Sequence, residues 1–142
     1  ELALTGTTSP NDGHVRQDFP GGWSSDLLNK FTATGRNKLE QSIWTYITTL
    51  ANFRKNSSAL TTGKMMQYVP VDGVYVYFRY DNTQTIMVVM NTSKEEKNIL
   101  PEKFAERTES FKEYRNILTG DKKPLGHFSL GSKQRVVLEL LK

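Results

Sequence analysis

The residues whose types and spacing could do chemistry gather in one N-terminal stretch, residues 12–23. Two acids, Asp12 and Asp18, flank Arg16, and a Pro-Gly-Gly turn leads from them to Trp23. The stretch has neither helical nor strand periodicity, which predicts an irregular surface loop, and ordered loops concentrate binding residues. A carboxylate accepts hydrogen bonds from hydroxyl groups, and an arginine fork holds a carboxylate or a hydroxyl. The pattern therefore predicts a loop that binds a polar ligand.

Each of these residues also has a purely structural interpretation. Arg16 could pair with Asp12 or Asp18 only to hold the loop, and exposed ion pairs of this kind contribute little energy. Trp23 could stack on a ligand, but after a Pro-Gly-Gly turn it is more readily explained as a plug that packs the loop onto its own domain. His14 has no second His or Glu at ligand spacing, so we predict no metal site.

No catalytic residues are predicted within the chain. It contains no Ser-His-Asp, Cys-His or glycine-rich phosphate pattern. Asp12 and Asp18 are therefore interpreted as binding or loop-holding residues, not as a catalytic pair. No cofactor is predicted either.

A long helix is predicted directly after this region. Asn37 and Glu40 have the spacing of a capping box, and apolar residues then recur at helical intervals up to Arg54. The resulting apolar face is formed by Leu39, Ile43, Tyr46, Ile47, Leu50 and Ala51. Trp44 and Phe53 make it wider. A shorter helix is expected over Asp26–Phe31, with Asp26 as its N-cap.

After Gly63 the pattern changes to short strands separated by turns, which are expected at Asp72-Gly73, Asp81-Asn82 and Thr119-Gly120-Asp121. The expected strands are rich in Val, Ile, Tyr, Phe and Met and cover residues 64–69, 73–80, 84–91, 97–100, 114–118 and 134–141. Residues 73–80 carry apolar bulk on both faces, which indicates a strand packed from two sides. A short helical excursion is expected at residues 101–106. The sequence thus predicts an α+β chain whose residues 1–62 hold a loop and a long helix and whose residues 63–142 form an antiparallel β-sandwich.

Composition excludes several other classes of protein. The 142 residues carry a net charge of +4, but basic and acidic residues are interleaved, which argues against nucleic-acid binding. No apolar run approaches the ~20 residues of a membrane span. The chain has no cysteine, which rules out disulfides within it but assigns no compartment. It begins without an initiator Met or a signal-peptide pattern, as expected of a chain that starts within a longer protein.

Several segments taken together resemble the C-terminal part of α-amylase-family glycoside hydrolases of the neopullulanase/cyclomaltodextrinase type. The stretch from Asp12 to Trp23 is similar to the loop after the eighth strand of their (β/α)8 barrel. The helix from Asn37 to Arg54, with the exit Lys55-Asn56-Ser57-Ser58-Ala59-Leu60-Thr61-Thr62-Gly63, resembles their last barrel helix. Residues 73–80 and 87–91 resemble the first hairpin of their C-terminal sandwich.

This resemblance implies a function and a site. In the family, an Asp-Pro-Asp-x-Arg type motif after strand eight touches sugar hydroxyls. Asp12 matches its first acid and Arg16 its arginine, whereas Gly13 and His14 replace the proline and the second acid. The catalytic acids of these retaining enzymes follow earlier barrel strands, so the resemblance implies a chain that is inert by itself and supports the barrel.

The implied partners follow from the same resemblance. The parent enzyme would bind an α-glucan or a maltooligosaccharide; its compartment is left open, with a periplasmic or secreted location slightly favoured over a cytoplasmic one. Because the wide helix face would lose its barrel partner, we expect it to be covered partly by the sandwich near Gly63 and partly by a second copy of the chain, in a homodimer through that face. The alternative is a free-standing carbohydrate-binding or protein-interaction sandwich with an N-terminal linker, although a linker has no reason to carry Trp44, Tyr46 and Phe53 on one helix.

Overall fold

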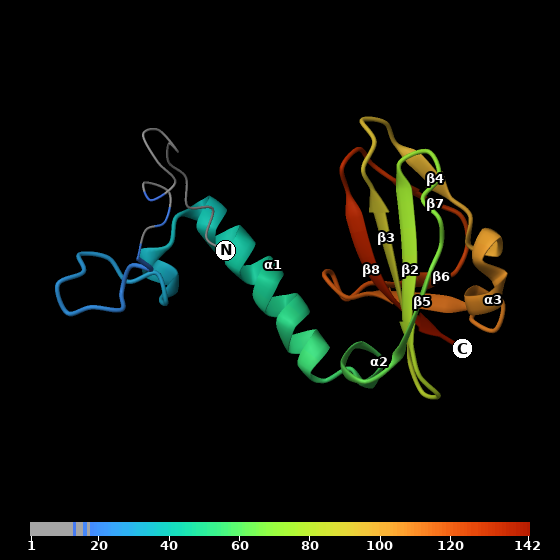
Figure 1. The fold of residues 1–142 in the computed structure, drawn as a ribbon, viewed down its shortest axis with the longest axis horizontal. Coiled ribbons are helices and arrows are strands. Elements are labelled where there is room, and N and C mark those ends of the chain that lie inside the picture. The colour runs from blue at the N-terminus through green and yellow to red at the C-terminus, as the bar shows by residue number, and fades with distance from the viewer. Residues whose placement is uncertain (1–12, 14–15, 17) are drawn as a thin grey trace. The chain divides into compact units, whose positions relative to one another are not determined.

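The computed structural model describes residues 13, 16 and 18–142. Its contacts group the chain into two units, Glu1–Thr49 and Leu50–Lys142. The boundary between the units falls inside helix α1 (Lys38–Lys55). Figure 1 labels α1 to α3 and β2 to β8, which are numbered in chain order. The two-domain division expected at residue 63 stays a prediction.

The first unit lacks the short helix expected over Asp26–Phe31, so that prediction is wrong. The Asp26 carboxylate accepts hydrogen bonds from the backbone N–H groups of Gly21, at 2.6 Å, and Trp23, at 3.1 Å. Asp26 therefore closes the turn that precedes it and is not available to cap a helix that follows it. The nearest regular element is a single 3-10 turn, η2 (Ala33–Gly35).

Helix α1 begins with the predicted capping box. The Asn37 side-chain oxygen accepts from the Glu40 N–H at 3.0 Å, and the Glu40 carboxylate accepts from the Asn37 N–H at 2.8 Å. Two of the otherwise unpaired donors at the helix start are satisfied in this way. On the apolar face, Leu39 and Ile47 remain 60% and 37% exposed. The homodimer through this face stays a prediction.

The Glu40 carboxylate also forms an ion pair with the loop that precedes α1. The Lys30 ammonium donates to it at 2.7 Å, and both side chains are largely buried. Arg36 donates to the Lys30 carbonyl at 2.5 Å and lies over the Trp44 ring, 4.2 Å from its centroid. The loop before α1 is therefore fastened to the first turns of the helix.

This arrangement makes loop order depend on pH. The Lys30 hydrogen bond, and next the Asn37 N–H, hold the pKa of Glu40 below its ordinary 4.5. Because the folded pKa is depressed, the stabilisation is complete above the ordinary pKa and is lost as the pH falls through the folded pKa. We expect Glu40→Gln to accelerate amide hydrogen exchange of residues 30–45 at pH 7, by a factor that shrinks below pH ~4.5. The exposed Glu109→Gln is the matched control, and equal exchange in both variants would contradict the assignment.

The second unit is built on an antiparallel sheet of six strands in the order β1-β2-β3-β8-β5-β6, with β4 and β7 paired separately. The strand β8, last along the described chain, lies between β3 and β5. The strands are β1 (Lys64–Gln67), β2 (Val74–Tyr80), β3 (Thr85–Asn91), β4 (Lys97–Ile99), β5 (Glu113–Asn116), β6 (Lys122–Pro124), β7 (Phe128–Leu130) and β8 (Arg135–Leu141). Six of these confirm predicted strands, and β6 and β7 were not predicted.

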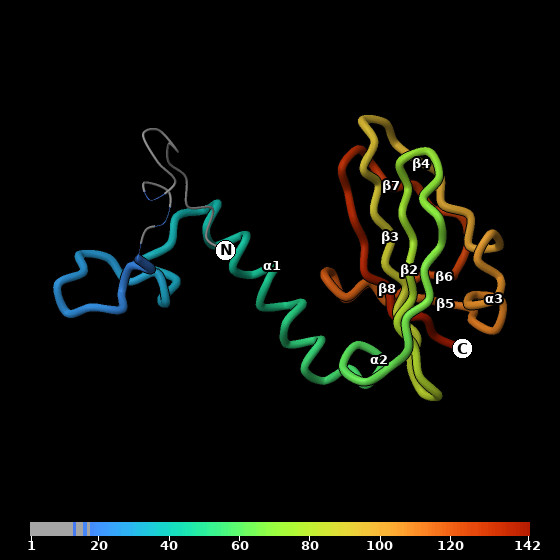
Figure 2. Tube along the Cα trace, viewed as in Figure 1, coloured from blue at the N-terminus to red at the C-terminus, as the bar shows by residue number. Residues whose placement is uncertain are grey.

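The hairpin that leads into β2 uses the predicted Asp72-Gly73 turn. Asp72 has φ 50° and Gly73 has φ 77°, and Val71 and Val74 exchange backbone hydrogen bonds across them. Two consecutive positive φ angles define the type I′ turn, whose twist matches that of the flanking strands. Figure 2 follows the chain through this turn and into β3. The register of the hairpin is therefore fixed locally.

Both faces of the sheet are packed, as the pattern of residues 73–80 predicted. One face carries Val76, Phe78, Met87, Val89, Leu138 and Leu140, which pack with the β4–β7 pair. The elements η3 (Pro101–Phe104) and α3 (Ala105–Thr108) form the predicted helical excursion, and Phe104 packs against the same core. The opposite face carries a smaller core of Ala59, Ile86 and Val88, covered by α2 (Ser58–Thr61). The second layer of the sandwich is thus a two-stranded ribbon with one helical excursion.

A polar network connects α2 to the sheet. The buried Ser57 hydroxyl, the N-cap of α2, donates to the Gln84 side chain at 2.5 Å. The Gln84 amide in turn donates to Glu139 at 2.7 Å, and Arg115 donates to the other Glu139 oxygen.

Gly63, at which the predicted exit from the long helix ends, lies directly beside α2 and β2. A Cβ atom placed on Gly63 would lie 2.4 Å from the Ala59 carbonyl oxygen and 2.7 Å from that of Tyr80.

One buried amide connects the sheet to the ribbon. Asn91, at the end of β3, is 2% exposed. Its side-chain N–H groups donate to the carbonyls of Glu95, Leu130 and Gly131 at 2.7, 2.9 and 3.0 Å. Its oxygen accepts from the Ser93 N–H at 2.9 Å and the Ser93 hydroxyl at 2.7 Å. Both ends of the amide are therefore fully used.

Candidate functional site

The binding residues predicted from the sequence lie at the start of the first unit. Arg16 is exposed, and its backbone N–H donates to the Gly13 carbonyl at 3.1 Å. Asp12 and His14 lie outside the described residues. The proposed pairing of Asp12 and Arg16 on a ligand, and the alternative in which they only hold the loop, are both still predictions.

Trp23 is 67% exposed, and the turn that carries it is closed by Asp26. An exposed indole held on a fixed turn can stack on a ligand or pack against another domain, and the structure of this chain is compatible with both. Within the described residues, no group of three or more His, Cys, Asp or Glu side chains gathers at a metal-binding distance. No helix there is long and apolar enough to cross a bilayer.

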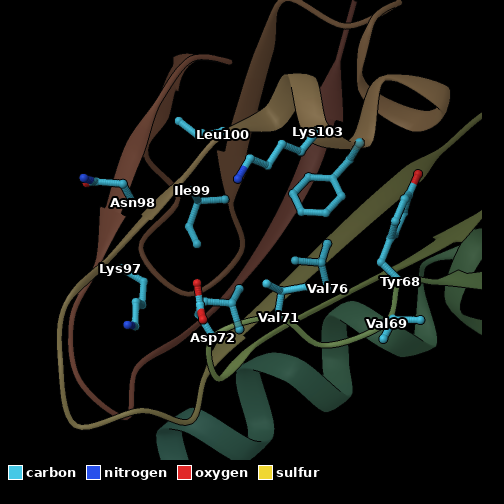
Figure 3. A pocket seen from close by; sticks show the side chains of 12 residues that line it. Tyr68, Val69, Val71, Asp72, Val76, Lys97, Asn98, Ile99, Leu100 and Lys103 are labelled. Carbon is cyan, nitrogen blue, oxygen red and sulfur yellow. The ribbon is translucent and has the colours of Figure 1, made fainter.

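The second unit contains a cavity that the sequence did not predict. It lies between residues 68–76 and residues 97–104 and has a volume of about 480 Å³ (Figure 3). Its walls are mainly apolar, formed by Val74, Val76, Ile99, Leu100 and Phe104 together with Tyr68, Val69 and Val71. Polar side chains at its border are Asp72, Lys97, Asn98 and Lys103. The one sequence feature that could have pointed to this cavity is a pair of valines, Val69 and Val71, beside the Asp72-Gly73 turn.

The aromatic end of the cavity is fixed by its neighbours. The Tyr68 ring lies 4.9 Å from the Phe104 ring in an edge-on arrangement and 6.0 Å from that of Phe78. The Tyr68 hydroxyl donates to Glu106 at 3.1 Å. Burial, and then the hydrogen bond to Glu106, raise the pKa of the Tyr68 hydroxyl, which stays neutral at pH 7.

The polar side chains of the cavity differ in how they are paired. Lys97 forms an ion pair with Glu95 at 3.2 Å, and the Asn98 oxygen accepts from the Ser129 hydroxyl at 3.0 Å. Among the described residues, the Lys103 ammonium and the Asp72 carboxylate have no hydrogen-bond or ion-pair partner. Asp72 is the one carboxylate of this lining. The cavity therefore supports binding, and its lining lacks the two carboxylates that glycoside hydrolysis uses.

This architecture defines the class of the protein: a two-layer antiparallel β-domain that is preceded in the chain by a long helix. Residues 65–139 match the model of the cyclo-malto-dextrinase C-terminal domain, which is more than half of the chain. The chain belongs to this family. The resemblance to the C-terminal part of an α-amylase-family glycoside hydrolase of the neopullulanase/cyclomaltodextrinase type is thereby confirmed.

Solved structures with the same fold include α-amylases. AmyP in complex with maltose is 16% identical, with a TM-score of 0.62 over 73% of this chain and 21% of that chain. The α-amylase of Geobacillus thermoleovorans complexed with acarbose is 16% identical, with a TM-score of 0.59 over 78% of this chain and 25% of its own. An Anoxybacillus α-amylase is 20% identical, with a TM-score of 0.59 over 85% and 26%. This chain spans about a quarter or less of these proteins, and at such identities the likeness establishes the fold.

Proposed function

We propose that this chain is the C-terminal region of a retaining α-glucan hydrolase and is catalytically inert alone. In this proposal residues 1–62 are the loop after barrel strand eight and the last barrel helix, and residues 63–142 are the sandwich that follows. The observation that carries the proposal is the family match over residues 65–139, preceded by an 18-residue helix with exposed apolar residues. The expected partner is a maltooligosaccharide, and AmyP, which has this fold, is solved with maltose and maltotriose.

The two regions would then have different tasks. Residues 63–142 would stabilise the end of the barrel, because their sheet packs against α2, which follows the last barrel helix in the chain. The loop forms one wall of the substrate cleft, with Asp12 and Arg16 contacting sugar hydroxyls. Support for this part comes from the fastening of the loop to α1 through the Lys30–Glu40 ion pair, since a loop that binds substrate must be held in place.

The test of inertness is direct. Incubated with starch, pullulan or cyclodextrin, the chain is expected to release no reducing sugar above the blank, because hydrolysis needs a nucleophile and an acid about 5–5.5 Å apart that this proposal places earlier in the enzyme. Turnover that survives purification and follows the protein peak would contradict it. Sequencing the coding region upstream of Glu1 is the complementary test, with a barrel pattern and three catalytic acids as the expected result.

The second candidate is a carbohydrate-binding module, which the cavity of the sandwich favours. The two candidates predict different affinities. A loop that contacts sugar only together with barrel residues leaves the isolated chain with millimolar affinity for maltooligosaccharides at best, about −4 kcal/mol. A micromolar dissociation constant by calorimetry, abolished by a substitution in the sandwich, would establish the module instead.

A further inference from the structure

We infer that the cavity between residues 68–76 and 97–104 is a weak binding site for a neutral oligosaccharide. Asp72 and Lys103 are its polar contacts, and its apolar walls receive the C–H faces of the sugar rings. That the sugar is an α-glucan rests on the proposed function. The existence of the site rests on the geometry of the cavity.

The shape and exposure of the cavity are those of a ligand site. Its volume of about 480 Å³ lies within the ~300–1,000 Å³ range of small-molecule pockets. At its border Val69 is 85% exposed and Val71 is 66% exposed. Exposed apolar residues that gather around an opening, and are not scattered singly, mark an interaction site.

The two polar side chains of the lining that lack a hydrogen-bond or ion-pair partner among the described residues decide which ligand fits. Figure 3 shows the Asp72 carboxylate and the Lys103 ammonium both directed toward the space between the two segments. A carboxylate only accepts hydrogen bonds at neutral pH, and an ammonium only donates them. A hydroxyl group does both, so a ligand rich in hydroxyls satisfies both side chains. The Asp72 carboxylate would repel an apolar anion, and the Lys103 ammonium would repel a cation.

The apolar walls complete the match to a sugar. A glucose ring has an apolar C–H face, which complements aromatic and aliphatic surface. Tyr68 and Phe104 supply that surface at one end of the cavity, and Val76 and Ile99 are buried beneath it. The Tyr68 ring cannot turn away without losing its hydrogen bond to Glu106.

The site is also held in place before a ligand arrives. Asp72 occupies the type I′ turn, with its backbone fixed by the exchange of hydrogen bonds between Val71 and Val74. Lys103 follows Pro101 in the η3 turn, where its N–H donates to the Leu100 carbonyl at 3.1 Å. A fixed backbone reduces the ordering cost of binding. Two contacts at the protein surface nevertheless give only weak affinity.

The experiment is a titration of the full 142-residue chain with maltotriose, followed by two-dimensional amide NMR. We expect chemical-shift changes at residues 68–76 and 97–104 that saturate in the millimolar range. Octanoate is the second probe, as an apolar anion. Shifts at the cavity with octanoate and none with maltotriose would overturn the inference and assign the cavity to an apolar partner.

Three variants locate the contact. Lys103→Met and Asp72→Asn are each expected to weaken maltotriose binding by about threefold to tenfold, the loss of one hydrogen bond to a charged group at the surface. Asn tolerates the positive φ of position 72, so the turn is preserved. Lys94→Met, the same charge change at an exposed lysine outside the cavity, is expected to bind as the parent chain does. Shifts that survive both cavity substitutions, or that occur only at residues 16–23, would overturn the inference.

The outcome is separable from that of the proposed function. Hydrolysis of maltotriose during the titration would contradict an inert chain without affecting the shifts at the cavity. Silent cavity amides in a folded, inactive chain would remove the sugar site and leave the proposed function standing.

Discussion

Replacing Asn91 with Asp is expected to remove a large share of the stability of the β-domain. An ionised Asp keeps the oxygen that accepts from Ser93 but cannot donate to the three carbonyls that the amide now contacts. It also places a charge at a site that is 2% exposed. Leaving buried partners unpaired around a buried charge costs about 3–5 kcal/mol, a large share of the ~5–15 kcal/mol that holds a domain together.

The measurement is chemical unfolding of the two chains at pH 7 and at lower pH. Since protonation removes the buried charge, the deficit of Asn91→Asp is expected to narrow as the pH falls. The matched control is Asn98→Asp. Asn98 is exposed and accepts from Ser129 through an oxygen that Asp retains, so its effect is expected within about 0.5 kcal/mol. Equal stabilities for the two Asp variants would show that Asn91 does not connect the layers.

The second large effect is expected from one methyl group at Gly63. The added Cβ would meet the Ala59 carbonyl oxygen at 2.4 Å and the Tyr80 carbonyl oxygen at 2.7 Å. Both are backbone atoms of packed elements, and Ala59 is fully buried. Gly63→Ala therefore has to separate α2 from β2, and we expect a loss of about 3 kcal/mol, the upper end for overpacking.

Gly126→Ala is the control for this substitution. A Cβ at Gly126 meets no atom within 4 Å, so Ala there is expected to be neutral or to stabilise by about 0.4–1 kcal/mol through the unfolded chain. Thermal unfolding distinguishes the two, at roughly 4–8 °C for each kcal/mol in a domain of this size. A Gly63→Ala chain as stable as the Gly126→Ala chain would mean that α2 is not tightly packed on the sheet.

Patterns that act over a few residues were predicted well. The capping box of Asn37 and Glu40 and the Asp72-Gly73 turn both formed as predicted. Five of the six predicted strands, all except the three-residue β4, have four to seven residues, and alternation over several residues carries a signal. The strands β6 and β7 have three residues each, and β6 reads Lys-Lys-Pro. Their pairing is decided by β5 and β4, which local patterns do not record.

Features that depend on backbone atoms or on partners distant in the sequence were missed. Asp26 has the residue type of an N-cap, but the backbone of Gly21 and Trp23 competes for its carboxylate. The cavity unites residues 68–76 with residues 97–104, and neither segment alone suggests a site. Gly63 was predicted as the end of a helical segment, whereas the backbone of Ala59 and Tyr80 also leaves no room for a Cβ atom there. In each case the deciding atom is remote in the sequence or belongs to the backbone.

The central position of β8 has a consequence for biosynthesis. A ribosome produces β1, β2 and β3 before the other strands of this sheet, and the pairing partner of β3 on its far side, β8, is the last of the described strands to be made. Until β8 emerges, the nascent hairpins expose an open strand edge and the apolar residues of both sheet faces, a state prone to association with other chains. The domain therefore closes in one late step after translation of β8, and its exposure to chaperones is set by the time between the synthesis of β3 and that of β8.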